Sequence, residues 1–205
     1  MANNFKNAFA SIVTAGENYQ STGSATDNHT GPQPVYTANN GSSGVNSILV
    51  ELDAANTGTA AVSVTAFVQD TSATLGTITS ITSSASDVAT VVCASAHGLQ
   101  TGQYVHVTGS TAAYVNGIYK ITRTSATEFT YQQNSGAADI GGGGYAGTIL
   151  IYPAYHIVKD VTIPVSSTLK IVSGQKIVLN ANDRVYAYAS AAHCDVIAGV
   201  LQEVD

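Results

Sequence analysis

The sequence is poor in charged residues and has no tryptophan. Only 10% of its 205 residues are charged, and its seven lysines and arginines do not form a cluster. An average soluble domain is about 25% charged. Because there is no basic cluster to neutralise phosphates and the formal net charge is −6, nucleic-acid binding is not expected.

The low charge does not predict disorder. Disordered chains combine low hydrophobicity with high net charge, whereas 44% of this sequence is hydrophobic. The chain should fold with a surface of Thr, Ser, Asn, Gln and Gly. Such a surface protects sheet edges poorly against pairing with other chains. We therefore expect a homo-oligomer, with the chain itself among its partners.

Long hydrophobic runs are absent as well. No stretch approaches the roughly 20 apolar residues of a membrane-spanning helix, and the first ten residues lack the apolar core of a secretory signal. We expect no membrane partner and synthesis in the host cytoplasm without an export signal.

Cysteine is scarce, with only Cys93 and Cys194. Two free, partly buried thiols are expected in a protein made in a reducing compartment. A disulfide would require the two residues to meet in space, which their spacing cannot show.

Helical periodicity is almost absent from the sequence. Short apolar alternations separated by Gly, Ser, Asn and Asp are typical of all-β proteins. In the segment 61–68, for example, Val62, Val64 and Ala66 alternate with Ser63 and Thr65. The sequence predicts an all-β, antiparallel β-sandwich with an inserted small β-barrel module, and one short helix around 5–13.

The strand pattern stops and resumes, which divides the chain. Residues 1–46 are predicted to be an N-terminal arm or linker, because the segment 17–44 is polar and loop-like. Residues 47–75 and 148–205 form a discontinuous sandwich domain, and residues 76–147 form the insert. An arm would order against a neighbour, so removing residues 1–44 should weaken assembly more than it lowers the melting temperature.

The insert resembles the small β-barrel module first named in ubiquitin-activating enzymes as the first catalytic cysteine half-domain. Versions of this module occur in phage tail and fibre proteins. The matching pieces are His97-Gly98-Leu99, Thr101-Gly102, Val105-His106-Val107, Gly109, Asn116-Gly117-Ile118-Tyr119 and Thr127-Glu128-Phe129-Thr130-Tyr131. The glycines suit tight chain reversals, and Asn-Gly is a strong hairpin signal. The resemblance implies structural turns and gives Cys93 no catalytic role.

The flanking sequence resembles small virion proteins of tailed phages. The matching segments are 1–8, 52–58, 158–167, 175–179 and 194–197. Members of that group are mostly known as virion, neck or tail-associated proteins, so the resemblance implies a place in the particle.

No catalytic, cofactor-binding or metal-binding residues are predicted. The histidines His29, His97, His106, His156 and His193 form no metal-ligand spacing. His97 is expected to be structural, and His193 and Cys194 should point to opposite faces of a strand. Asp53, Asp70, Asp160 and Asp183 lie near turns, where an Asx-type turn is favoured over a calcium site. The tyrosines, including the pair Tyr186 and Tyr188, are expected to pack in the sandwich more often than to bind sugars.

The function predicted from the sequence is a structural component of a tailed-phage virion, located in the virion and in contact with other virion proteins. A neck, collar or tail-associated assembly subunit is ranked first, and a capsid decoration (cement) protein second. An adhesin that binds a host-surface glycan or receptor is the alternative of another class. A lytic enzyme ranks last, because no paired catalytic acids are recognisable.

Overall fold

The structure is a computed structural model, and it describes residues 4–12, 32–38, 46–72, 75, 78–83, 88–108, 117–132 and 150–204. Within these ranges the regular elements are strands, as the sequence predicted. They are listed here in chain order: β1 (Asn4–Ile12), β2 (Gln33–Thr37), β3 (Asn46–Asn56), β4 (Val62–Gln69), β5 (Ile78–Ser83), β6 (Val88–Cys93), β7 (Tyr104–Thr108), β8 (Gly117–Arg123), β9 (Glu128–Gln132), β10 (Leu150–Ile163), β11 (Thr168–Leu179), β12 (Arg184–Ala189) and β13 (Cys194–Val204).

The chain divides into two units. Unit 1 comprises Met1–Glu17, Gly31–Ser72 and Tyr155–Asp205, and unit 2 comprises Asn18–Thr30 and Ala73–Ala154. The insert expected at 76–147 falls inside the longer segment of unit 2. Strand β10 crosses the division, because its residues up to Ala154 pair with β7 and its later residues belong to unit 1.

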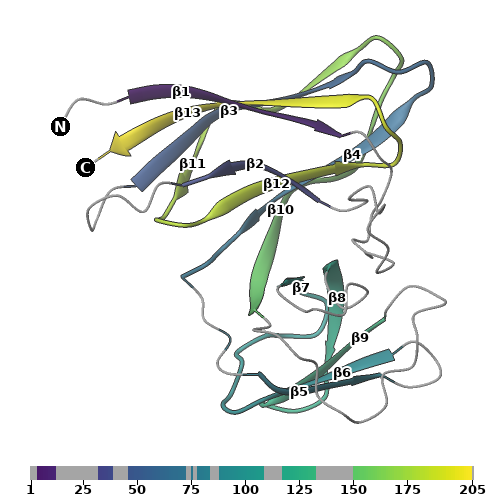
Figure 1. The fold of residues 1–205 in the computed structure, drawn as a ribbon, viewed down its shortest axis with the longest axis vertical. Helices are drawn as coiled ribbons and strands as arrows, with labels where there is room; N and C mark the ends of the chain where they lie inside the picture. The colour runs from purple at the N-terminus through teal and green to yellow at the C-terminus, as the bar shows by residue number, and fades with distance from the viewer. Residues whose placement is uncertain are drawn as a thin grey trace, which may run out of the picture. The chain divides into compact units, whose positions relative to one another are not determined.

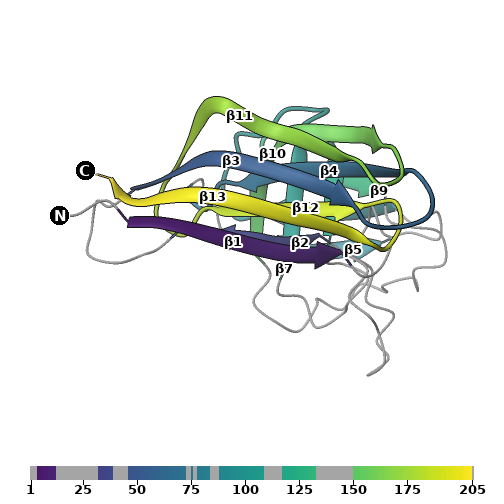
Figure 2. The same cartoon turned by 90° about the horizontal axis from the view of Figure 1, so that it is seen from above.

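Unit 1 is a sandwich of two antiparallel sheets, with strand orders β1-β13-β3-β11 and β2-β12-β4-β10. Figure 1 shows the two layers, and Figure 2 shows the first sheet face-on. Counted along unit 1, the first sheet holds strands 1, 8, 3 and 6, and the second holds strands 2, 7, 4 and 5. This is the jelly-roll arrangement, in which two Greek keys fold into a double sheet. The unit 2 segment enters between the fourth and fifth strands of the roll.

Alternation in the sequence fills the sandwich core. Val62, Val64 and Ala66 of β4 face Leu49 and Leu52 of β3, and all are almost fully buried. The opposite face of β4 is buried as well, since Thr65 and Phe67 have no exposed surface. A strand buried on both faces explains why the second face of 61–68 reads as mixed in the sequence.

The first strand corrects two expectations. Residues 4–12 form β1 and pair with β13 from Asn4 opposite Gln202 to Ile12 opposite Cys194, so the helix predicted around 5–13 is wrong. Residues 33–37 form β2 and pair with β12, so the segment 1–46 is not an arm throughout. Ile12 and Tyr36 are buried in the sandwich. A truncation of residues 1–44 would therefore remove two core strands, and it no longer tests assembly separately from stability.

A buried polar network links the two sheets of the sandwich. The Tyr36 hydroxyl on β2 shares a hydrogen bond of 2.9 Å with Ser47 Oγ on β3 and accepts one of 2.8 Å from Gln202 Nε2 on β13. These three polar side chains are satisfied by one another, which removes the cost of burying them.

Unit 2 has its own core, and its pairings run in the order β10-β7-β8-β9-β6-β5. Val91, Val105, Phe129 and Tyr131 are among its buried residues. Gly98 and Gly102 adopt φ values of +71° and +93°, which confirms the tight reversals predicted from the glycines. The described strands pair in an open order, so closure into a barrel stays a prediction, and Asn116 and 141–144 lie outside the described residues.

Deleting residues 76–147 and joining the ends with a short linker should leave the sandwich folded. The reason is that the two described cores share no residue. Thermal unfolding followed by circular dichroism should show one cooperative transition for the deletion variant. Loss of cooperative unfolding would show that the sandwich depends on the insert.

Candidate interaction surface

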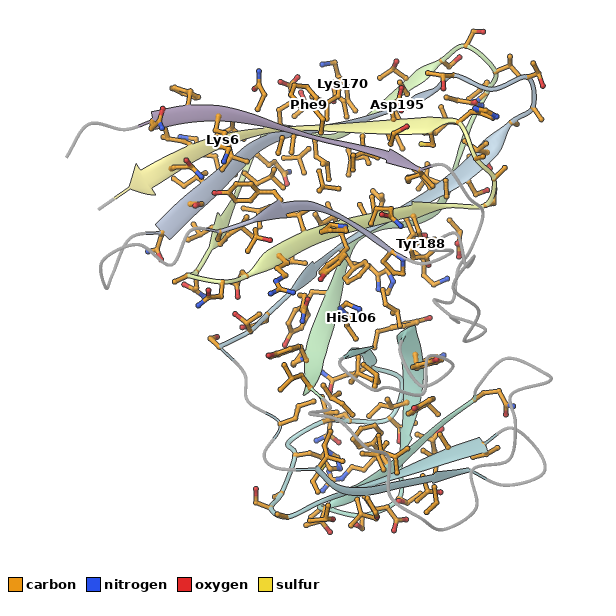
Figure 3. All side chains as sticks on the ribbon, in the orientation of Figure 1. Lys6, Phe9, His106, Lys170, Tyr188 and Asp195 are labelled. Carbon is orange, nitrogen blue, oxygen red and sulfur yellow. The ribbon has the colours of Figure 1, made fainter. Side chains whose placement is uncertain are left out.

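Exposed apolar side chains gather on the sheet β1-β13-β3-β11. Phe5 is 74% exposed and Phe9 is 69% exposed, both on β1, and Ile197 on β13 is 43% exposed. They point away from the sandwich core, because Ala8, Ala10 and Ile12 take the inward positions of β1. We call this side of the sheet the outer face. Figure 3 shows Phe9, Lys170 and Asp195 on it.

Strand register arranges the outer face in rows across four strands. One row holds Phe5, Leu201, Ile48 and Val178. A second row, four residues along β1, holds Phe9, Ile197, Asp53 and Lys170. The first row is thus apolar on all four strands, whereas the second is apolar on β1 and β13 and charged on β3 and β11. An exposed apolar patch rimmed by polar residues is typical of an interaction site.

The charged side of the outer face is an ion cluster. Lys170 Nζ lies 3.5 Å from both Glu51 Oε1 and Asp53 Oδ2. The negative charge of Asp53 and the hydrogen bond to it raise the pKa of Lys170 above its ordinary value, and Glu51 adds to this. Lys170 and Glu51 are more than half exposed, whereas Asp53 is only 21% exposed. The exposed Lys170–Glu51 pair contributes little to folding stability, and both groups are open to a partner's charges.

A cleft of about 290 Å³ opens beside strand β11. It is lined by Ile157, Lys170, Ile171, Val172, Ser173, Gln175 and Ile177. The strand leaves regular register between Ser173 and Ile177, where Gly174 has a φ of +75°. Lys170 is the single ionisable group among these lining residues, and it is the lysine of the ion cluster with Glu51 and Asp53.

The histidines named from the sequence do not converge on one site. His97 is buried: its Nδ1 accepts a 3.0 Å hydrogen bond from the Leu99 N–H, and its ring meets the edge of Phe129 at 5.2 Å. The ring shapes the Gly98 reversal. His106 is buried on β7, and His156 lies beside Phe67 at 6.1 Å in unit 1. His193 has a φ of +69° in the turn before β13, and His29 lies outside the described residues.

The four aspartates have separate structural partners. Asp53 contacts Lys170, and Asp70 Oδ1 accepts hydrogen bonds from the Ser72 N–H and hydroxyl. Asp160 contacts Lys159, whose hydrogen bond lowers the pKa of the Asp160 carboxyl. Asp183 is buried and accepts backbone N–H bonds of 2.9 Å from Asn180 and Thr71. The Asx-type turn that the sequence favoured is present at Asp70, which accepts the N–H two residues on, whereas Asp183 bonds back to Asn180 and across to Thr71 and forms no such turn.

The tyrosine pair of β12 is buried. Tyr186 stacks on Phe67 at 5.3 Å with an interplanar angle of 8°, and Tyr188 is 5% exposed. Figure 3 shows Tyr188 on the side of the second sheet away from the sandwich core. In unit 2, Tyr119 and Tyr131 stack at 4.1 Å. Tyr155 is half exposed, and Tyr114 and Tyr145 lie outside the described residues.

The two cysteines are free thiols. Cys93 is buried in unit 2 and Cys194 in unit 1. Burial raises the pKa of both thiols, and that of Cys194, to which Asp195 adds, rises to about 11. Since the thiolate is the reactive form, neither thiol should react readily in the folded protein.

We expect a disulfide-exchange reagent at pH 8 to label native protein slowly and to label two thiols per chain after unfolding. Because the Cys194 pKa is raised on folding, its stabilising effect is complete below pH 9 and fades as the pH rises toward 11. Unfolding midpoints measured between pH 8 and pH 11 test whether stability falls as the pH rises. Rapid labelling of both thiols in native protein would contradict the burial.

No family model matches this chain, and no curated protein matches it. Over the ranges described, no three His, Cys, Asp or Glu side chains gather to hold a metal ion. A search of the same ranges found no helix long and apolar enough to cross a membrane.

Sequence reasoning missed the outer face. Phe5, Asn7, Phe9 and Ser11 alternate with Lys6, Ala8 and Ala10, which is a strand signal. Because this stretch was instead predicted to be a short helix, the two phenylalanines were not expected to be neighbours on one face of a sheet.

Proposed function

We propose that this protein is a structural subunit of a tailed-bacteriophage virion. The observation that carries the proposal is the jelly-roll order of the eight sandwich strands, an architecture that viral capsid domains use. Jelly rolls also serve lectins and cupins, and a fold alone does not determine function. The character of the surface therefore has to support the proposal as well.

The outer face provides that support. An assembly subunit needs a surface that other copies or other proteins can cover, and Phe5, Phe9 and Ile197 provide an apolar one. The cleft beside β11, by contrast, has Lys170 as the one ionisable group among its lining residues. Contact between proteins therefore fits the described residues better than catalysis, and the proposal gives the protein no enzymatic role.

Two positions in the particle are proposed, and symmetry separates them. A neck, collar or tail-associated subunit would form a ring around the tail axis. A capsid decoration protein would follow the icosahedral lattice of the head. Rings arise from heterologous contacts, whereas pairs arise from contacts that use the same patch twice.

The test is whether the protein is present in purified particles. Virions from the source of this sequence would be banded on a density gradient, analysed by mass spectrometry, and labelled with gold-conjugated antibodies raised against the chain. We expect the chain at a stoichiometry of several copies per particle, with gold on the neck, tail or head surface. Its presence in the infected-cell lysate together with its absence from banded particles would contradict the proposal.

A further inference from the structure

We infer that two copies of this chain join along their β1 strands, so that the two four-stranded sheets become one sheet of eight. The inference rests on the proposed role as an assembly subunit, because it names a second copy of the chain as the partner of the outer face. A strand that adds to a free sheet edge gains main-chain hydrogen bonds along its whole length.

Among the described residues, β1 is an edge strand of the sandwich that pairs on one side only, with β13. It runs for nine residues, pairs with β13 without a register shift, and carries a single charge at Lys6. The other edges are blunted, including β10 beyond Ala154, which carries Lys159 and a positive φ at Asp160. Edge strand β2 has five residues, Pro34 and a register shift, and edge strand β11 has two register shifts and two lysines. Short strands, prolines, bulges and lysines protect edges that must stay unpaired. Strand β1 is long, has no proline or bulge and carries one lysine, so it is the least protected edge and the one that we infer pairs.

One register suits an antiparallel β1–β1 pair. If the two-fold axis passes through Asn7, Phe5 of each copy lies opposite Phe9 of the other. Lys6 then faces Ala8 of the other copy, so no like charges meet. Moving the axis to Lys6 would place the two lysines opposite each other, which is unfavourable. The register centred on Asn7 is the one that pairs both phenylalanines with each other, and aromatic cross-strand pairs stabilise sheets.

The rows of the outer face continue across this junction. The row that ends Ile48, Leu201, Phe5 in one copy meets the row that begins Phe9, Ile197 in the other. The two-fold axis repeats the same junction on the other side of Asn7, with the two copies exchanged. Four phenylalanines and their aliphatic neighbours thus gather at the centre, and the ion clusters of Glu51, Asp53 and Lys170 lie at the two ends. An apolar centre with a charged rim is the usual pattern of an interface.

A cysteine at the two-fold axis tests both the contact and its register. Asn7 is exposed on the outer face, so Asn7→Cys should not disturb the fold. Residues directly opposite in an antiparallel pair have Cα atoms about 4.5–5.5 Å apart, within the range that a disulfide spans. We expect copper-catalysed air oxidation of the full-length variant to give a covalent dimer on a non-reducing gel. The buried Cys93 and Cys194 should not contribute.

Ser11→Cys is the matched control, since Ser11 is exposed on the same face of the same strand. With the axis at Asn7, the two Ser11 positions lie about 27 Å apart at 3.4 Å per residue, so this variant should stay monomeric on the gel. A dimer from Asn7→Cys alone supports the inference. No dimer from Asn7→Cys, or equal dimers from both variants, overturns it.

Analytical ultracentrifugation of protein without an engineered cysteine measures the same dimerisation independently. Phe9→Glu removes both aromatic cross-strand pairs and should raise the dissociation constant of the dimer about tenfold or more. Val178→Glu places the same charge on the same face at 60% exposure, but on β11, and should leave the constant unchanged. Wild-type protein that sediments as a monomer at high micromolar concentration, or equal effects of the two variants, overturns the inference.

Failure of the pairing and failure of the proposed function are distinguishable. A chain found in particles but monomeric in these tests keeps its virion role and loses the β1 contact. A chain that pairs in these tests but is absent from particles keeps the β1 contact and loses the virion role. A positive result also bears on position, because icosahedral shells contain two-fold axes and a cyclic ring around a tail does not. The β1 pair therefore favours the decoration position.

Discussion

Replacing Phe129 with alanine is expected to destabilise unit 2 by about 3–5 kcal/mol. Phe129 has no exposed surface and lies in the core with Val91 and Tyr131. Its ring also packs at a steep angle against that of His97, the residue that shapes the Gly98 reversal. Removing the ring would leave a cavity and take away the packing of that turn. The expected loss is a large fraction of the about 5–15 kcal/mol that is typical for the free energy of unfolding of a domain.

The measurement is denaturant unfolding, combined with amide hydrogen exchange to locate the loss. Thr130→Ala is the control, because Thr130 is the next residue on β9 and points to the opposite, half-buried face. It should cost no more than about 0.5 kcal/mol. Exchange should accelerate in β6, β8 and β9 and stay slow in β3 and β13. Equal costs for the two variants would show that the assigned faces of β9 are wrong.

Replacing Asp183 with alanine is expected to cost unit 1 about 2–4 kcal/mol. The buried carboxylate holds two distant turns together: Oδ2 accepts the Asn180 N–H, and Oδ1 accepts the Thr71 N–H and, at 3.3 Å, the Thr71 hydroxyl. Alanine would leave two partly buried N–H donors without an acceptor, and each such donor costs about 1–3 kcal/mol.

Asp70→Ala is the matched control for Asp183. Asp70 accepts comparable hydrogen bonds from the Ser72 N–H and hydroxyl, but at an exposed turn where water can replace it. We expect a loss within about 1 kcal/mol, measured by denaturant unfolding of both variants. If Asp70→Ala proved as costly as Asp183→Ala, burial would not be what makes the Asp183 carboxylate important.

The local features of the fold could be predicted from sequence. The alternation of Val62, Val64 and Ala66 identified the core face of β4, and Gly98 and Gly102 identified reversals that require positive φ. Both signals are short-range: a side chain two residues along a strand returns to the same face, and glycine accepts a backbone conformation that other residues avoid.

The pairing of distant strands could not be predicted in the same way. Ile12 lies opposite Cys194, and Asp183 bonds Thr71 across 112 positions of sequence. A periodic pattern says which face of a strand is apolar but not which strand lies beside it. For β1 the alternation indicates a strand, but the composition favours a helix, because the inward residues Ala8 and Ala10 are good helix formers. Pairing with β13 overrides that local preference, and the jelly roll and the outer face depend on this pairing.

The central claim is that this chain is built into a virion, and the most direct measurement is a cryo-EM reconstruction of the purified particle. The account predicts density on the particle exterior that fits the two sheets β1-β13-β3-β11 and β2-β12-β4-β10, repeated by the symmetry of the head or of the neck and tail. Paired copies with adjacent β1 strands at a two-fold axis would support the inferred contact as well. A reconstruction in which every density is assigned to other chains, and none accommodates this sandwich, would contradict the claim.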